Sequence, residues 1–560
     1  MEILNVENLT FKYPLGKEPV IKNINFTVSE GEFIVLSGAT GSGKSTLLKL
    51  LKPEITPLGE KQGKVTLFGE ELNNDEEKKT VSPSKLGYVG QNPKEQVVTD
   101  KVWHELAFGL ENMNMSQNEM NAKVAEMAAY FGIEDWFDRK VDELSGGQLQ
   151  LLNLASVMVM DPDILILDEP SAQLDPVAAS EFFTTIKKLN MDFALTIIIA
   201  EHRLEELVPL CDRLMVMKQG EIVLNGKPED VLEKVNSDDE IFEALPSAYR
   251  LYKRINNGIR SKDINVEYVV ENHKVPLNIR EGREYLKSLI GNTKTTKSSV
   301  EKSQGSEVAL EFKDVSFRYN KEAEDALKDL SFKVYSEEIF CILGGNGSGK
   351  TTALNAAAGL IRPYEGSIKL FGKKLKEYKN QSLYNHCLSM LPQDVQTIFL
   401  HNTVREELEK RNALEKLSSF PFDLYGVLDK HPYDLSGGEQ QLVTLAIVLA
   451  TDPKIMLLDE PTKGLDSYRK IKLTETLKKL KAEGKTIVIV THDVEFAAQC
   501  ADRCALFFRG SLASIGDSET FFRGNSFYTT SACRLSRGIC DGSVTIEGLA
   551  DDIYKALNML

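Results

Sequence analysis

The chain carries the same series of four motifs twice, and this internal repeat most strongly limits what it can fold into. "GATGSGKST" (38–46) returns as "GGNGSGKTT" (344–352), and "LSGGQLQLLNLA" (144–155) returns as "LSGGEQQLVTLA" (435–446). "VENLTFKYP" (6–14) also returns as "FKDVSFRYN" (312–320), and "ILILDEPSAQLD" (164–175) as "IMLLDEPTKGLD" (455–466). Four motifs that recur in one order predict two related domains in tandem.

The spacing of the motifs repeats as well. Tyr13 lies 25 residues before Gly38, and Tyr319 lies 25 residues before Gly344. The segment between the glycine loop and the LSGG motif differs: Lys44 to Ser145 is 101 residues, but Lys350 to Ser436 is 86. We therefore expect the two halves to share a core and to differ in this segment.

Length and composition narrow the class of protein. A chain of 560 residues is too long for one core, and a net charge of −16 argues against nucleic acid as a partner. Seven cysteines, an odd number without a regular framework, fit a reducing compartment. No signal peptide opens the sequence, and apolar runs such as 193–200 are far shorter than the roughly 20 residues that span a bilayer. We expect a protein that is soluble or attached peripherally to a membrane.

The glycine-rich motif predicts a phosphate-binding loop in each half. Both copies fit G-x-x-x-x-G-K-[ST], and each follows an apolar run, as a strand–loop–helix unit requires. The glycines let successive backbone N–H groups point at phosphate oxygens, and the following helix turns its positive end to the same place. Lys44 and Lys350 are expected to reach the phosphates, while Ser45 and Thr351 offer hydroxyls to Mg²⁺.

The acidic motif predicts the other side of each metal site. "ILILD" and "IMLLD" are patterns of buried strands that end in Asp168 and Asp459, which are placed to hold Mg²⁺ directly or through water. The next residues, Glu169 and Glu460, can turn into the site at the strand end and polarise an attacking water.

The LSGGQ and LSGGE segments, 23 residues before the Asp-Glu pairs, resemble the signature of ABC-type ATPases. The resemblance covers nearly all of both halves. It implies an α/β fold with two P-loop NTPase nucleotide-binding domains in tandem, each with a helical signature subdomain and a small C-terminal appendage. It further implies head-to-tail pairing within the chain, with ATP held between the P-loop of one domain and the signature of the other.

By that resemblance the site residues fall into three groups, with ATP and Mg²⁺ as ligands. The catalytic group comprises Glu169, Glu460, His202, His492, Gln91 and Gln393. The metal group comprises Ser45, Gln91, Asp168, Thr351, Gln393 and Asp459. The nucleotide-binding group comprises Tyr13, Gly38, Gly41, Ser42, Gly43, Lys44, Ser45, Thr46, Ser145, Gly146, Gly147, Tyr319, Gly344, Gly347, Ser348, Gly349, Lys350, Thr351, Thr352, Ser436, Gly437 and Gly438.

Some of these positions have a second interpretation, and others depart from the family pattern. Each tyrosine, taken alone, also fits core packing rather than stacking on adenine. Asp175 and Asp466 match the loop that links the two sites in the family. Leu151 and Leu442 stand where an Arg is common, and Glu201 replaces the usual Thr before the first histidine. None of these departures removes a group that contacts phosphate, so we predict two hydrolytic sites.

The segment "QNPKEQVVTDKVWHELAFGLEN" (91–112) closely resembles the ATPases of energy-coupling-factor (ECF) importers for vitamins or metal ions. The resemblance implies a peripheral protein on the cytoplasmic face of a prokaryotic membrane. Its partners would be an integral-membrane scaffold with coupling helices and a small substrate-capturing membrane subunit. The alternative is a soluble tandem ATPase that acts on ribosomes or nucleic acid, which the acidic charge disfavours.

The two halves differ after the shared glutamine. Pro93 and Gln96 follow Gln91, whereas "DVQTIFL" follows Gln393, and we expect these loops to fit two different coupling helices; drift of an exposed loop is the other interpretation. The expected boundaries are 1–228 and 309–523 for the ATPase domains, 229–290 and 524–560 for an appendage on each half, and 291–308 for a flexible linker.

Overall fold

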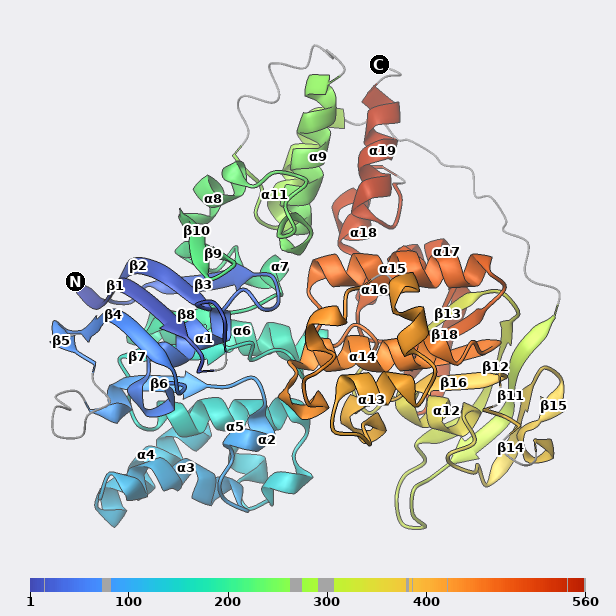
Figure 1. Cartoon of the computed structure of the whole chain (residues 1–560), viewed down its shortest axis with the longest axis horizontal. Helices are drawn as coiled ribbons and strands as arrows, with labels where there is room; N and C mark the ends of the chain where they lie inside the picture. The colour runs from blue at the N-terminus through green and yellow to red at the C-terminus, as the bar shows by residue number, and fades with distance from the viewer. Residues whose placement is uncertain are drawn as a thin grey trace. The chain divides into compact units, whose positions relative to one another are not determined.

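The structure, a computed structural model, describes residues 1–14, 16–72, 82–261, 274–290, 307–378, 382–384, 386–420, 422–540 and 542–557 (Figure 1). It divides into two compact units, Met1–Tyr249 and Arg250–Leu560. Each unit holds one copy of the repeated motifs, and both have the predicted α/β architecture. The tandem P-loop fold expected from the repeat is confirmed.

The first unit is built on two sheets. The smaller, antiparallel sheet has the order β2-β1-β4-β5, with β2 Ile21–Ser29, β1 Glu2–Lys12, β4 Glu60–Leu67 and β5 Glu70–Glu71. The larger sheet has the order β10-β9-β3-β8-β7-β6, with β10 Glu221–Gly226, β9 Arg213–Lys218, β3 Phe33–Gly38, β8 Thr196–Ala200, β7 Ile164–Asp168 and β6 Leu86–Val89. Its strands are parallel except for β10, so their carboxyl ends meet along one edge.

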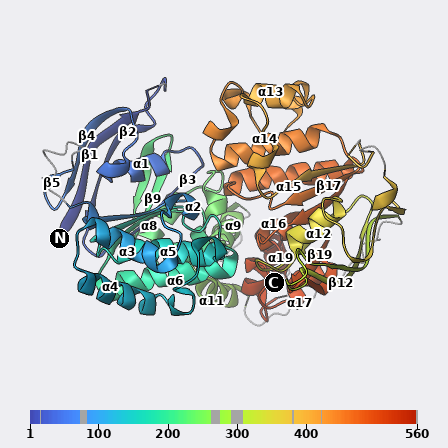
Figure 2. The ribbon, with the colours of Figure 1, turned by 90° about the horizontal axis from the view of Figure 1, so that it is seen from below.

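The apolar runs explain this arrangement. Strands β7 and β8 are buried at every position, as parallel strands covered on both faces must be. Helix α1 (Lys44–Leu50) packs its leucines into one core with the smaller sheet and with one face of the larger sheet. Helices α3 (Val102–Asn112), α4 (Gln117–Tyr130), α5 (Gly146–Met158) and α6 (Pro176–Phe193) gather on the other side, as Figure 2 shows.

The second unit repeats both sheets. Its smaller sheet has the order β12-β11-β14-β15, with β12 Leu327–Tyr335, β11 Val308–Phe317, β14 Glu365–Leu370 and β15 Lys373–Lys374. Its larger sheet has the order β16-β17-β18-β13-β19-β20, with β16 Leu388–Leu391, β17 Ile455–Asp459, β18 Thr486–Val490, β13 Ile339–Leu343, β19 Arg503–Phe508 and β20 Ser511–Asp517. Helix α12 (Lys350–Ala357) takes the place of α1, and α15 (Ser467–Ala482) that of α6.

The segment of unequal length is the helical subdomain. In the first unit α3 and α4 pack against each other and against α5. In the second unit α13 (Val404–Glu409) and α14 (Gly437–Ala450) are joined by short 3₁₀ turns, which include Leu414–Ser419 and Tyr425–Val427. The shorter spacing in the second half therefore reflects 3₁₀ turns in the place of a long helix.

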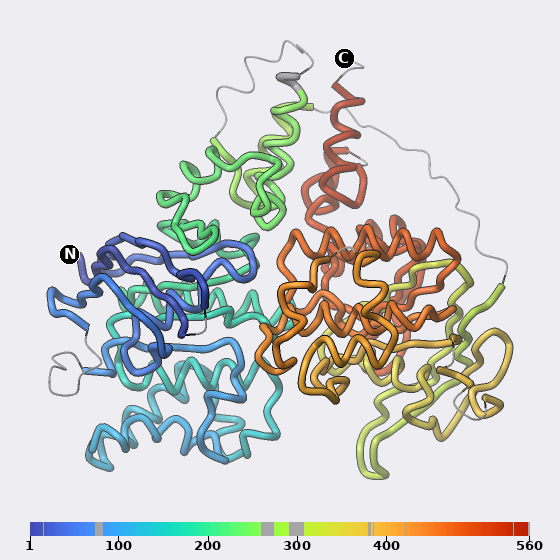
Figure 3. The backbone as a smooth tube through the Cα atoms, in the orientation of Figure 1, coloured from blue at the N-terminus to red at the C-terminus, as the bar shows by residue number. Residues whose placement is uncertain are grey.

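The C-terminal segments of the two halves meet within the second unit. We expected each to form an appendage on its own half. In the structure α11 (Ile279–Ile290) packs against α18 (Ser531–Ser536) and α19 (Ile546–Leu557), as the backbone trace in Figure 3 shows. Helix α9 (Ser247–Ser261) begins in the first unit, where the Tyr249 hydroxyl donates to the carbonyl of Leu232.

Polar contacts fix this four-helix junction. The Tyr554 hydroxyl of α19 donates to the carbonyls of Arg254 and Ile255 in α9, at 3.0 Å for Ile255. Arg254 Nη2 lies 3.2 Å from Glu547 Oε1. Arg283 Nη1 of α11 donates to the carbonyl of Arg534 at 2.7 Å. Helices α9, α11, α18 and α19 thus pack together, while the predicted domain boundaries stay a prediction. Most of the predicted linker, 291–306, lies outside the described residues, and β11 begins at Val308.

Gly258 of α9 offers a direct test of this junction. A Cβ at this position would lie 2.0 Å from the Tyr554 hydroxyl oxygen, so Gly258→Ala must displace the ring and weaken its bonds to α9. We expect a destabilisation of about 1–3 kcal/mol, measured as faster hydrogen exchange in 247–258 and 546–557. The control is Gly524→Ala at the end of α17 (Ser518–Gly524), where a Cβ meets nothing within 4 Å. Equal exchange in both variants would contradict the packing described.

Candidate functional site

The glycine loop of each unit follows a buried strand and ends at a helix start. β3 is buried throughout and ends at Gly38, and α1 begins at Lys44. Gly38 has φ of 154°, and a Cβ there would lie 2.3 Å from the carbonyl oxygen of Met217 in the neighbouring strand. Gly344 repeats this in the second unit, with φ of 153° and a contact of 2.5 Å to the carbonyl of Phe507. Only glycine fits where each strand turns into its loop.

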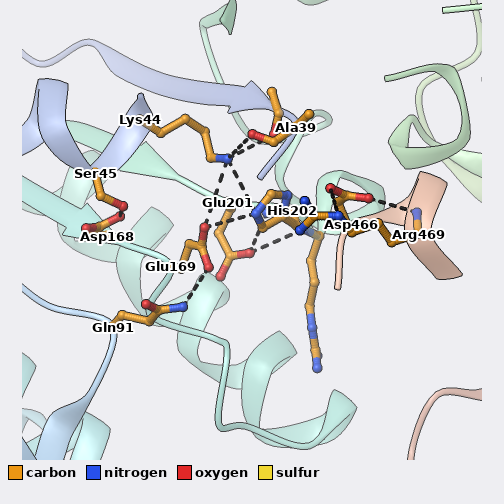
Figure 4. Close-up of polar contacts among 12 residues, drawn as sticks. Ala39, Lys44, Ser45, Gln91, Asp168, Glu169, Glu201, His202, Asp466 and Arg469 are labelled. Atoms are coloured by element: carbon orange, nitrogen blue, oxygen red, sulfur yellow. Dashed lines mark hydrogen bonds and ion pairs between the residues drawn. The ribbon is translucent and has the colours of Figure 1, made fainter. Parts of the chain in front are cut away.

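The lysine of each loop folds back over the loop's own backbone. Lys44 Nζ donates to the carbonyls of Gly38 at 2.9 Å and Ala39 at 3.2 Å, as Figure 4 shows. Lys350 Nζ donates to Gly344 at 2.8 Å and Gly345 at 3.0 Å. Both ammonium groups are buried, so each is a preplaced cation that can turn to a phosphate group.

The two residues predicted to hold Mg²⁺ in the first unit, Ser45 and Asp168, are in contact. Asp168 ends β7, and the Ser45 hydroxyl donates to its Oδ1 at 2.9 Å. Burial raises the pKa of the Asp168 carboxyl, while the bonds from Ser45 and Tyr88 lower the pKa by less. A hydroxyl and a carboxylate in contact are hard oxygen ligands of the kind that Mg²⁺ prefers.

Tyr88 was missed by the sequence analysis. Its hydroxyl donates to Asp168 Oδ2 at 3.1 Å from the neighbouring strand β6, so that both carboxylate oxygens are bonded. In an apolar strand, the sequence pattern predicts that a tyrosine packs in the core. The available signal was its register, because β6 pairs with β7 in parallel next to the predicted acid.

The second unit places the corresponding acid differently. Met390 stands in β16 where Tyr88 stands in β6. Both oxygens of Asp459 are buried, and among the described residues none donates to them in hydrogen-bond geometry. Burial raises the pKa of Asp459 to about 6, and the nearby Thr351 hydroxyl lowers it by less. Two buried oxygens without donors fit a cation, which would stabilise the ionised carboxylate.

The second acid of each pair turns into the site through its backbone. Glu169 and Glu460 adopt left-handed φ values of 45° and 49°, which non-glycine residues rarely do. Such strain concentrates at functional positions, and here it recurs at both copies of the motif. In the first unit the residue with this backbone, Glu169, has its carboxylate beside His202 and Gln91.

Glu169 brings three predicted site residues together. Its Oε1 lies 2.9 Å from His202 Nε2, its Oε2 accepts from Gln91 Nε2 at 2.9 Å, and Lys44 Nζ is 4.0 Å away (Figure 4). In the second unit Glu460 Oε2 lies 3.0 Å from His492 Nδ1 and accepts from the Thr491 hydroxyl at 3.2 Å. Gln393 is exposed, and its side chain makes no hydrogen bond to any residue in the described ranges.

The signature serines begin helices. Ser145 caps α5 and Ser436 caps α14, each in a capping box with the residue three positions on, Gln148 or Glu439. Both serines are exposed, and the helices that they begin are 13 and 14 residues long. The positive ends of these helices are therefore open to an anion.

The two tyrosines occupy matching places beside the glycine loops. The hydroxyl groups of Tyr13 and Tyr319 lie 3.1 Å from Thr46 Oγ1 and Thr352 Oγ1. Each ring meets a phenylalanine edge-on at 5.0 Å, and Tyr319 is 63% exposed. Their rings are placed by packing, and they also border the loops as an adenine-stacking residue would.

The loop aspartates Asp175 and Asp466 have a local role as well. Asp175 Oδ1 accepts from the backbone of Ala178 at 2.9 Å, and Asp466 Oδ1 from that of Arg469 at 2.9 Å. Each thereby caps the helix that follows its loop.

No helix within the described ranges is both long and apolar enough to cross a membrane.

Known ATP-binding proteins are similar to this chain over most of its length. The "Putative ABC transporter ATP-binding protein" of Bacillus thuringiensis subsp. konkukian is 37% identical over 560 residues, which is 98% of each chain. The "Putative HMP/thiamine import ATP-binding protein YkoD" of Bacillus subtilis is 30% identical over 538 residues, 93% of each. A chain in the crystal structure of the archaeal ribosomal stalk protein aP1 with the archaeal ribosome recycling factor aABCE1 matches with a TM-score of 0.57. That match is 20% identical over 92% of this chain and 91% of that one, and it shows the fold alone.

The family itself is established over the region that holds the site. The ABC transporter family model matches residues 21–172 and 327–463, which together exceed half of the chain. These ranges include both glycine loops, both signatures and both Asp-Glu pairs. The chain belongs to the ABC transporter family, as an ATP-binding protein with two ATPase domains in tandem.

Proposed function

We propose that this ATPase is the energy-coupling subunit of an ECF-type importer for a vitamin or metal ion, with two composite ATP sites formed within one chain. The observation that carries the proposal is the segment that follows Gln91. It resembles the corresponding segment of ECF ATPases, and in the structure hydrogen bonds connect it to Glu169 and to helix α5.

The residues of this segment support one another. Asn92 caps α2 (Pro93–Gln96) by accepting from the backbone of Lys94 at 3.3 Å, and Pro93 occupies the first helical position. Gln96 folds back on the strand end: it accepts from the backbone of Gly90 at 2.9 Å and donates to the carbonyl of Tyr88 at 2.8 Å. The N-P-x-x-Q pattern thus builds one closed turn directly after Gln91.

Hydrogen bonds connect this turn to the signature helix α5 and to the loop that follows the acid pair. Asn153 of the signature helix donates to the carbonyl of Pro93 at 3.1 Å. Gln173, in the loop after the acid pair, donates to Asn92 Oδ1 at 3.2 Å. A change at Glu169 would therefore reach α5 through Gln91 and this turn, which is the route that coupling to a membrane partner requires.

The matching segment of the second unit is built from other residues. Asp394 caps a 3₁₀ turn, Val395–Ile398, and Gln396 Nε2 lies 3.4 Å from Gln440 Oε1 of α14. Leu400 is 75% exposed where the first unit has the 66% exposed Val98. Two turns with different apolar tips fit two different coupling helices of one asymmetric scaffold.

The chemistry follows from the geometry of the side chains. Lys44 and Lys350 would bind the β and γ phosphates, and Ser145 or Ser436 would offer donors to the γ-phosphate from a helix start. Mg²⁺, held by Ser45 with Asp168 or by Thr351 with Asp459, would neutralise phosphate charge when bound. Glu169 and Glu460 would polarise the attacking water. His202 and His492 would hold these two carboxylates in place. Gln91 would respond to the state of the first site.

The Bacillus subtilis relative is named a putative HMP/thiamine import ATP-binding protein, which agrees with the proposed class. The likeness to the ribosome recycling factor rests on the fold alone, so it does not favour the ribosomal alternative.

Purification under native conditions tests the proposed partners. The tagged chain, extracted from membranes in mild detergent, is expected to carry along two kinds of integral-membrane protein, a scaffold and a small substrate-capturing subunit. Mass spectrometry identifies them. Recovery of ribosomal subunits in place of membrane proteins would contradict the proposal and support the alternative.

Removal of both acids tests the catalytic role. In Glu169→Gln with Glu460→Gln the carboxylates that would polarise water become amides of the same size. We expect turnover to fall by at least about a hundredfold while ATP still binds. Phosphate release and equilibrium ATP binding measure the two properties. Glu181→Gln with Glu483→Gln, both exposed, serves as the control. Turnover near the control value would show that the acids do something else.

Gln96 tests the role of the turn. Gln96→Ala removes both bonds that close the turn on β6, whereas Gln396→Ala removes one long bond in the second unit. We expect Gln96→Ala to reduce recovery of membrane subunits several-fold with ATP affinity unchanged, and Gln396→Ala to have a smaller effect. Equal recovery of these subunits by both variants and the parent would mean that the turn does not serve assembly.

A further inference from the structure

Glu201, a departure from the family pattern, is a buried anchor in the first unit. It stands between β8 and His202 and is 3% exposed. Its Oε1 accepts from the backbone of Ser171 at 3.0 Å. Its Oε2 accepts from the backbone of His202 at 2.8 Å, as Figure 4 shows, and from that of Arg203 at 3.2 Å. One carboxylate therefore joins the histidine loop to the loop that follows Glu169.

Arg203 makes a second connection between the same two loops. Its Nη2 donates to the carbonyl of Leu174 at 3.0 Å, directly before Asp175. Glu201 thus holds the start of the 171–174 loop, and Arg203 holds its end. Both partners are backbone groups, so the connection fixes the path of the chain rather than the rotamer of one side chain.

The second unit uses other residues for the same loops. Thr491 stands in the place of Glu201; its hydroxyl donates to Glu460 and accepts from the backbone of Asp493 at 3.0 Å. Asp493 stands in the place of Arg203, and its carboxylate accepts from Lys470 of α15 at 2.6 Å. There the histidine loop is attached to the catalytic acid itself and to a helix.

The energetics favour a firm connection in the first unit. A buried carboxylate is costly unless it is bonded, and three N–H donors satisfy this one. Its removal would leave three backbone donors without their acceptor, each at a cost comparable to a lost hydrogen bond. The contact of 2.9 Å between His202 and Glu169 depends on the backbone that these bonds hold.

We infer that Glu201 and Arg203 are positioning residues that lock the His202 loop to the 171–174 loop, so that the Glu169–His202 pair of the first unit is set before ATP binds. The inference rests on the function proposed for Glu169 and His202. Neither residue is placed on the nucleotide. They act through the backbone, and they make the two ATP sites of the chain unequal in how their histidines are held.

The test uses the full chain with Glu460→Gln, so that turnover reports the first centre. Glu201→Ala removes all three bonds, and Glu201→Gln keeps one oxygen acceptor. Arg203→Ala removes the bond to the carbonyl of Leu174 and leaves the three bonds of the Glu201 carboxylate in place. Glu181→Ala on α6 is the exposed control. Hydrogen exchange without nucleotide is measured over 169–175 and 201–204, and kcat and KM for ATP are measured separately.

We expect Glu201→Ala to speed exchange in both segments and to lower kcat by about tenfold or more, with KM changed less than about threefold. Glu201→Gln should lie between it and the parent. Arg203→Ala should speed exchange in 171–175 but not in 201–204. This variant still tests the inference if Glu201→Ala folds poorly.

Unchanged exchange in Glu201→Gln and Arg203→Ala would overturn the inference, as would faster exchange with kcat at the parent value. Failure of the function proposed for Glu169 has a different result. If Glu169 does not act in hydrolysis, Glu169→Gln in the same background leaves turnover intact. The exchange measurements still decide whether the two loops are locked.

Discussion

Everything in the two sites depends on parallel strands that end along one edge of a sheet. In the first unit β3, β6, β7 and β8 are paired in parallel register, with Leu36 and Asp168 both opposite Ala200. Their carboxyl ends deliver the glycine loop, the Gln91 turn, the acid pair and the histidine to one place. The second unit has the same strand order and therefore the same convergence. Because the strands are buried on both faces, this edge is where polar side chains can gather.

Within that shared frame the units hold equivalent groups by different contacts. Asp168 is bonded by Ser45 and Tyr88, whereas Asp459 keeps its oxygens without donors among the described residues. Glu169 is bonded by Gln91, and Glu460 by Thr491. A fused chain can hold such differences in place, since each half evolves its own supporting residues while the reacting groups stay the same. Two unequal sites also suit a partner with two unequal docking surfaces.

The sequence predicted the candidate site residues that belong to motifs of known chemistry. It missed the residues whose contacts depend on how the chain folds. The motifs around Gly38, Lys44 and Asp168 predicted the strand, loop and helix correctly, because the phosphate and metal binding expected there demands those residue types. Tyr88 was missed because the sequence of an apolar strand does not show which residue a tyrosine will contact. Its partner Asp168 is identified only when the pairing of β6 with β7 is known. Glu201 was read as a harmless substitution, since it contacts no phosphate; its importance lies in three backbone donors that only the folded loops bring together.

The helices of the C-terminal segments were predicted from the sequence, but their packing partners were not. Their weak mutual similarity predicted two helical appendages, and helices are present in both. That α11 would pack against α18 and α19 rests on contacts such as Arg283 with Arg534, more than 200 positions apart in the chain. Helical periodicity identifies an apolar face, but it does not say which partner covers it.

The pairing of the two halves is the central claim, and counting bound nucleotide tests it most directly. In the chain with both catalytic glutamates changed to Gln, Lys44→Ala is combined either with Ser436→Glu or with Ser145→Glu, and trapped ATP per chain is measured. If each P-loop faces the other half's signature, Lys44→Ala with Ser436→Glu damages one site and leaves one ATP, while Lys44→Ala with Ser145→Glu damages both and leaves none. The reverse result would place each signature on its own P-loop and contradict the account.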